Sequence, residues 1–172
     1  AGTGGDAEQL RIATVTPGFF PVLGVRAIHG RVLGPEDFVA GPARPILLSH
    51  ALWTRRFGGD PAIVGQQIVL NDRPARVVGV MGRDFKLLFP PDAAVPEDLE
   101  AWVPGGAQLG TQPRGQQYLR VVGRVKPGVK TPAAIQEVSA VGATIVAAFP
   151  GNYTPGWRFY AVPMQEDSVR PL

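Results

Sequence analysis

Two neighbouring residues, Ser49 and His50, are the first place to look for chemistry, because a hydroxyl activated by an imidazole can act as a nucleophile. Side chains that are adjacent in sequence meet only in a special turn, and no G-x-S-x-G elbow surrounds Ser49. A helix N-cap explains Ser49 better. The other histidine, His29, has no partner in the sequence. A hydrolase that uses Ser49 and His50 is therefore kept as the third of three hypotheses.

Three acidic groups could supply the paired carboxylates that glycoside hydrolases use as acid and base. They are Glu36 with Asp37, Glu97 with Asp98 and Glu100, and Glu166 with Asp167. Each group lies within a few residues of a proline, in or near a predicted turn. The three tryptophans are well separated, so no aromatic sugar platform accompanies these acids. We interpret the carboxylates as capping and solvated residues.

Composition excludes several kinds of metal and cofactor site. The chain has no cysteine and only 2 histidines, which excludes thiolate zinc sites, disulfides and histidine-rich metal sites. The glycine-rich residues 2–5 and 58–59 lack the lysine and Ser/Thr of a phosphate-binding loop. We expect no catalytic residue, no cofactor and no metal, and we expect that the chain is not an enzyme.

The positive charge of the chain does not indicate nucleic-acid binding. Its 17 basic and 14 acidic residues give a net charge of +3. The basic residues are scattered, and Arg55-Arg56 is the only basic doublet. A surface that follows phosphates needs clustered charge. We therefore expect no nucleic acid among the partners.

The length of 172 residues and the 45% hydrophobic content suit one domain or two small lobes with a real core. The 22 glycines and 18 prolines predict many short elements joined by tight turns. The longest uncharged stretch, 138–157, contains two prolines and several polar residues, so it does not predict a membrane span. The first residues have neither the basic nor the apolar region of a signal peptide.

Helix starts are predicted where a capping side chain precedes a proline. This pattern occurs at Thr16-Pro17, Asp60-Pro61 and Thr131-Pro132, and the last of these opens the longest helix, which ends near Phe149. A further helix is expected to begin at Ser49 and to stop at Gly58-Gly59.

Strands are predicted where β-branched residues cluster between turn signals. These segments are 11–15, 25–32, 45–48, 67–70, 75–80, 102–103, 118–125 and 157–162. Asn71-Asp72 predicts a hairpin turn between two of them. Trp157, Phe159 and Ala161 would share one face of the last strand.

The predicted long helix has one apolar stripe and an unusual opposite face. Its stripe consists of Ile135, Val138, Gly142, Ile145, Val146 and Phe149. The rest of its surface carries no charge beyond Glu137, although a solvated helix face normally has more. The helix is either an ordinary alanine-rich surface helix or a helix whose second face is covered by a partner or by further chain.

Three stretches of the sequence carry extended motifs in a fixed order. The longest, residues 48–65, reads LSHALWTRRFGGDPAIVG and continues through IVLNDRP at 68–74 to VVGVM at 77–81. Upstream, VTPGFFPVLGV at 15–25 precedes Gly30-Arg31, and downstream VGRVKPGV at 122–129 precedes the long helix. In this order the stretches resemble the periplasmic core domain of MacB-type (FtsX-like) ABC-transporter permeases, particularly the duplicated permeases abundant in Acidobacteria. The similarity covers about residues 8–172.

The resemblance implies an α+β fold with a porter-like α/β lobe and a smaller inserted β-rich lobe. Residues 1–43 and 114–172 would form the first lobe, and 44–113 the second. It implies a non-catalytic, extracytoplasmic domain that transmits ATP-driven motion to substrate export. The implied partners are an ABC nucleotide-binding subunit or domain, a second permease in a dimer, and a periplasmic adaptor.

In that family another strand and helix precede the position of Ala1, so we expect the chain to lack part of its first lobe. We expect Ala140, Ala143 and Ala147 on the long helix to line an exposed apolar patch or a contact between chains. The second hypothesis for the function is a stand-alone exported binding or interaction module without catalytic activity.

Overall fold

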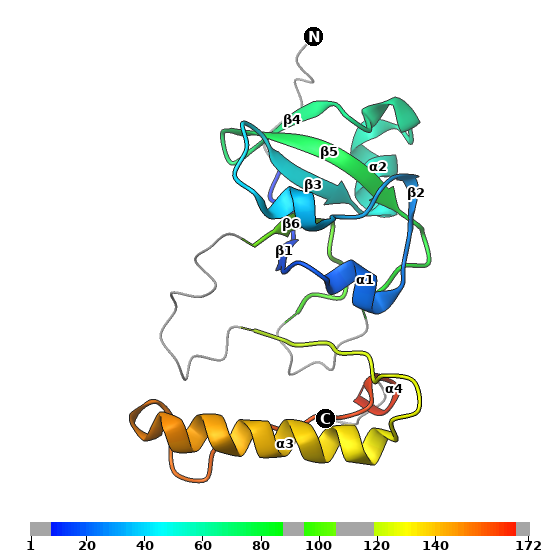
Figure 1. Cartoon of the computed structure of the whole chain (residues 1–172). Helices are drawn as coiled ribbons and strands as arrows, with labels where there is room; N and C mark the ends of the chain where they lie inside the picture. The colour runs from blue at the N-terminus through cyan, green and yellow to red at the C-terminus, as the bar shows by residue number, and fades with distance from the viewer. Residues whose placement is uncertain (1–7, 88–94, 106–118, 168–172) are drawn as a thin grey trace. The chain divides into compact units, whose positions relative to one another are not determined.

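The chain forms two compact units, which are described separately (Figure 1). The computed structural model describes residues 8–87, 95–105 and 119–167. Unit 1 comprises Ala1–Leu87 and Pro96–Gly106, and unit 2 comprises Leu88–Val95 and Ala107–Leu172.

The described part of unit 1 is built on a six-stranded mixed sheet (Figure 1). The strands are β1 (Ile12–Val15), β2 (Ala27–Gly30), β3 (Arg44–Leu48), β4 (Gln67–Leu70), β5 (Arg73–Met81) and β6 (Ala101–Pro104). Their order is β1-β6-β3-β5-β2, and β4 also pairs with β5. The pairs β1–β6 and β3–β5 are parallel, and the other pairs are antiparallel. All six strands overlap segments that the sequence predicts as strands.

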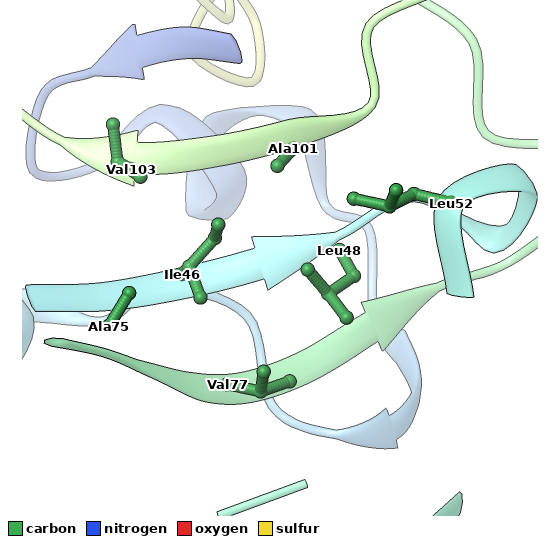
Figure 2. Close-up of a cluster of buried hydrophobic side chains, with 7 residues drawn as sticks. All are labelled: Ile46, Leu48, Leu52, Ala75, Val77, Ala101 and Val103. Atoms are coloured by element: carbon green, nitrogen blue, oxygen red, sulfur yellow. The ribbon is translucent and has the colours of Figure 1, made fainter. Parts of the chain in front are cut away.

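The main core of unit 1 lies between the sheet and α2 (His50–Phe57). Figure 2 shows Leu52 of α2 together with side chains from three neighbouring strands. These buried side chains are Ile46, Leu48, Leu52, Ala75, Val77, Ala101 and Val103. Full burial of each Leu, Ile or Val contributes roughly 1.5–3 kcal/mol, so this cluster holds α2 on the sheet.

A second, aromatic cluster lies on the opposite face of the sheet. Leu47 points away from the α2 face because successive side chains of a strand alternate, and its register partner is Trp102. The Trp102 ring lies 6.2 Å from the ring of Phe20 and 5.4 Å from that of Phe85. Because both faces are covered, the run 45–48 is apolar throughout and does not alternate with polar residues.

The β4–β5 hairpin confirms the turn predicted at Asn71 and Asp72. Both residues have positive φ angles, of 50° and 59°. Two successive residues of this kind form the type I′ turn that matches the twist of a hairpin. The register follows from the turn, with Leu70 opposite Arg73.

The helix starts of unit 1 agree with the predicted caps, with one exception. The Ser49 hydroxyl accepts the Leu52 N–H at 3.1 Å, and the Asp60 carboxylate accepts the Ala62 N–H at 2.9 Å where η2 (Pro61–Ile63) begins. The other short helices are α1 (Phe19–Leu23) and η1 (Pro35–Phe38). The cap predicted at Thr16 is wrong.

Helix α1 begins later than predicted because Gly18, with a φ of 90°, precedes it. Thr16 contributes its backbone carbonyl to a turn, where the Phe19 N–H bonds it at 3.2 Å.

Unit 2 contains the predicted long helix, α3 (Thr131–Ala148), followed by η5 (Pro150–Asn152) and α4 (Met164–Asp167). Lys130, without a side-chain cap, occupies the N-cap position. Thr131 and Pro132 are instead the first two helical residues, so the predicted Thr131 cap is wrong by one position. The end of α3 agrees with the prediction, since the Phe149 N–H closes the helix on the carbonyls of Ile145 and Val146.

The two strands predicted in unit 2 are absent from its described part. Tyr118 lies outside the described residues, and residues 119–125 and 157–162 make no strand pairing with other described residues. A strand is stabilised by ladder hydrogen bonds to a neighbour, and α3 offers none because a helix satisfies its own backbone. The predicted alternation is still present at Trp157, Phe159 and Ala161, which are half-buried between exposed neighbours.

Helix α3 packs against this extended segment at Gly142. Gly142 is buried, and a Cβ atom there would lie 2.4 Å from the Cβ atom of Phe159. The Phe159 ring lies 5.9 Å from the Tyr153 ring, which in turn lies 6.0 Å from Trp157. In the described part of unit 2, Gly142 of α3 therefore packs against one member of a small aromatic cluster.

The predicted α+β class is confirmed. The lobe division expected from the family resemblance, with 1–43 and 114–172 in one lobe and 44–113 in the other, stays a prediction. Within unit 1, β1 and β2 from the first of these ranges pair with β6 and β5 from the second.

The tight approach of β2 to β5 at Gly79 gives a testable prediction. A Cβ atom on residue 79 would lie 2.3 Å from the carbonyl oxygen of Arg31. Gly79→Ala should therefore force backbone movement and lower the free energy of unfolding by about 1–3 kcal/mol in urea denaturation. Gly82→Ala is the control, because its nearest neighbour, the Cγ2 atom of Ile28, would lie at an ordinary 3.4 Å. Equal unfolding midpoints for the two variants would contradict this packing.

Candidate functional site

Ser49 and His50 are not brought together as a nucleophile and its base. The buried Ser49 caps α2 with its hydroxyl, and its N–H donates to the Glu100 carbonyl at 2.8 Å. The Nδ1 atom of His50 lies 3.3 Å from the Thr54 hydroxyl. No hydrogen bond joins Ser49 to His50 among the described residues. The structure thus assigns Ser49 the capping role that the sequence predicts.

Both histidines of the chain contact the same tryptophan. The rings of His29, on β2, and His50, on α2, lie 5.1 Å and 5.3 Å from the Trp53 ring. The Nε1 atom of Trp53 donates to the Asp60 carbonyl at 2.9 Å. These contacts join α2 to β2 and to the turn after α2. The sequence shows no partner for His29, because this contact spans 24 residues between two different elements.

Glu100 connects the starts of β1 and β6 with the last turn of α2. Its buried carboxylate accepts the Arg11 N–H at 2.9 Å and the Arg55 guanidinium at 2.7 Å. Arg55 also pairs with Glu8, and Arg11 pairs with Asp98 at 2.6 Å. Burial by itself would raise the pKa of Glu100. The hydrogen bonds from Arg11 and Arg55, together with their charges, outweigh burial and hold that pKa below its usual value.

Asp37 makes a second buried ionic contact, in η1. Its carboxylate accepts hydrogen bonds from both terminal nitrogens of Arg31, one of them at 2.9 Å, and from the Gly34 N–H at 2.9 Å. Glu36 also pairs with Arg31, at 3.1 Å. Burial would raise the pKa of Asp37, but these hydrogen bonds and the nearby positive charges lower it overall.

The interpretation of the acidic groups as solvated residues is wrong for Asp37 and Glu100. Both are buried and paired with arginines. Asp37 also caps a turn, as expected, whereas Glu100 pairs with Arg55 across 45 residues of sequence, a distance at which no local pattern indicates a contact. In the third group, Glu166 lies exposed in α4 and its N–H donates to the Pro163 carbonyl at 3.0 Å.

No cluster of three or more His, Asp or Glu side chains suited to a metal ion occurs within residues 8–87, 95–105 and 119–167. None of the helices in these ranges is long and apolar enough to cross a membrane.

The second face of α3 is exposed in the structure. Ala140, Ala143 and Ala147 share one side of α3, which is turned away from Gly142, and all three are exposed. Val138 and Val141 on the same helix are 42% and 54% exposed, so the uncovered apolar surface extends beyond the alanines. Whether this face contacts a partner stays a prediction.

The pairing of Glu100 predicts a specific loss of stability in acid. Because its folded-state pKa is lowered, the stabilisation is complete above the unfolded pKa of about 4.3 and is lost as the pH falls through the folded value. Glu100→Gln should lower the free energy of unfolding at pH 7 by about 1–3 kcal/mol, measured by urea titration. In this variant the free energy of unfolding should also fall less steeply as the pH drops below 5. Exposed Glu97→Gln is the control, and parallel pH profiles for the two variants would contradict the assignment.

Comparison with known proteins supports the family resemblance. Residues 1–141 match the family described as the MacB-like periplasmic core domain. A curated relative, macrolide export ATP-binding/permease protein MacB 1 of Aeromonas hydrophila subsp. hydrophila, is 31% identical over 122 residues. These residues cover 70% of this chain and 18% of the relative.

The fold is similar to that of a solved member of the family. The periplasmic region of MacB from Actinobacillus actinomycetemcomitans matches with a TM-score of 0.52 and 16% identity. The match covers 81% of this chain and 56% of that one. The chain belongs to the family of MacB-like periplasmic core domains, which lie on the periplasmic side of ABC-transporter permeases.

Proposed function

We propose that the chain couples ATP-driven motion of an ABC-transporter permease to the export of a substrate or to partners in the periplasm. The family match over residues 1–141 carries this proposal. The curated relative is named as an ATP-binding/permease protein for macrolide export, and this chain spans 18% of its length. ATP hydrolysis would therefore take place in a nucleotide-binding subunit or domain outside this chain.

The chemistry of unit 1 supports a role in transmitting motion rather than in catalysis. The residues that first indicate chemistry are used in structural bonds: Ser49 caps α2, and Asp37 and Glu100 are held by arginines. Paired, hydrogen-bonded carboxylates with lowered pKa values stay ionised at neutral pH and are poor proton donors. We propose that the domain is not an enzyme and needs no cofactor.

The proposed partners follow from the family. They are the nucleotide-binding subunit or domain, reached through the membrane part of the permease, a second permease in a dimer, and a periplasmic adaptor. The proposed lobe division places residues 1–43 and 114–172 in one lobe and residues 44–113 in the other.

A single-cysteine labelling experiment on the natural gene product tests the permease assignment. Val69 is 77% exposed on β4, and the chain has no cysteine of its own. Val69→Cys should react with a membrane-impermeant maleimide in spheroplasts, and the labelled polypeptide should stay in the membrane pellet after carbonate washing. The unmutated protein is the control for background labelling. Labelled polypeptide in the soluble periplasmic fraction would favour a stand-alone exported module instead.

We propose in addition that Ala140, Ala143 and Ala147 form a contact face in the assembled permease. Their exposure, and the absence of charge beyond Glu137 on α3, support this proposal. Ala143→Cys should react with a maleimide several-fold more slowly in the assembled transporter than in the 172-residue chain. Val141→Cys, on another side of α3, should show a smaller difference. If the maleimide reaction is slowed equally at the two positions, there is no specific contact at the alanines.

A further inference from the structure

A groove in unit 1 carries recognition chemistry that the proposed function does not use. It lies where η1 and the loop after it face the β4–β5 hairpin, and its volume is about 410 Å³. This is within the range of small-ligand sites, roughly 300–1,000 Å³. Charged residues in and before η1 and on the hairpin line it, together with the apolar residues of the segment 39–45.

Two of the charged groups in the groove are already fully engaged. Asp37 is buried, and its carboxylate accepts hydrogen bonds from Arg31 and from the Gly34 N–H. Arg31 in turn is held by Asp37, by Glu36 and by the carbonyl of Val32. The Arg31 guanidinium is thus shared by two carboxylates, so this wall is preorganised and carries one net negative charge, which faces the positive charge of Arg76.

Arg76 is the cation of the groove that still has free donors. It is exposed on β5, and it makes no hydrogen bond or ion pair within the described part of the chain. Gln67 lies directly opposite it in the β4–β5 ladder. Side chains of directly opposed residues leave the sheet on the same face, so Gln67 and Arg76 are neighbours on the face that lines the groove.

The third feature is an apolar wall beside these two polar groups. Val39, which lines the groove, is 73% exposed, an unusual position for a β-branched apolar side chain. Pro42 and Pro45 continue this wall. A guanidinium, an amide and an apolar wall together match a carboxylate, a peptide bond and an apolar side chain.

We propose that this groove binds the C-terminal residue of a peptide. Its carboxylate would pair with Arg76, because a guanidinium binds a carboxylate through two parallel hydrogen bonds. Its last peptide bond would meet the Gln67 amide, and its apolar side chain would lie on Val39, Pro42 and Pro45. The proposal does not depend on the transport function, since it follows from the groove alone.

The smallest probe with all three groups is N-acetylleucine, and N-acetylleucinamide is the same molecule without the charge. Both would be titrated into the isotopically labelled 172-residue chain at fixed pH and followed by backbone amide chemical shifts. N-acetylleucine should give saturable shifts at residues of the 39–45 loop, at Gln67 and at Arg76. The amide should bind roughly tenfold more weakly, as expected for the loss of one charged hydrogen-bonded contact.

Variants separate this site from general attraction to positive charge. Arg76→Gln should weaken N-acetylleucine binding roughly tenfold and remove the preference over the amide. Arg73→Gln removes the same charge from β5, three residues away and therefore on the other face of the sheet, and should change the affinity less than twofold. The absence of saturable shifts in the groove, or an equal loss of binding in both variants, would overturn the proposal.

Discussion

The pairing of β1 with β6 is the contact on which the sheet of unit 1 depends. It joins the first and the last strand of that unit, which lie almost the whole length of the unit apart in sequence. Glu100 accepts the Arg11 N–H at one end of this pair, across 89 residues of sequence, and the Gly105 N–H bonds the Val15 carbonyl at the other end. Between these bonds, Ile12 to Val15 run parallel to Ala101 to Pro104. Closing a long loop costs conformational entropy, and a buried, charge-assisted hydrogen bond at its start offsets part of that cost.

The rest of unit 1 is arranged around this closure. Once β6 is fixed beside β1, its other edge receives β3, and β3 brings α2 onto the face that carries the aliphatic core. Arg55 near the end of α2 then reaches back to the same Glu100 carboxylate. Backbone pairing, core packing and an ionic contact thus all hold β6, β3 and α2 together. We expect a unit held in this way to move as one body, which the proposed role in transmitting motion would require.

Much of this fold could be predicted from sequence because its signals are local. Ser49 and Asp60 cap helical turns through bonds that span two or three residues, and Asn71-Asp72 fixes a hairpin. What local patterns could not show were contacts between distant residues, such as Glu100 with Arg55 or His29 with Trp53.

The errors in unit 2 have the same origin. Residues 119–125 and 157–162 have the composition of strands, and the second also has their alternation, yet a strand forms only beside another strand. The alternation predicted which side chains of 157–162 turn inward. It could not supply a partner for their backbone.

The central functional claim, that ATP-driven motion passes through this domain, is tested most directly by a distance measurement in the assembled transporter. Spin labels at Val69→Cys in unit 1 and Tyr160→Cys in unit 2 occupy exposed positions. A pulsed dipolar measurement should give different distance distributions in the nucleotide-free and ATP-trapped states. A reference pair within unit 1, at Val69→Cys and the half-exposed Ile28→Cys, should stay unchanged. Identical distributions for the first pair in a transporter that hydrolyses ATP would contradict the account.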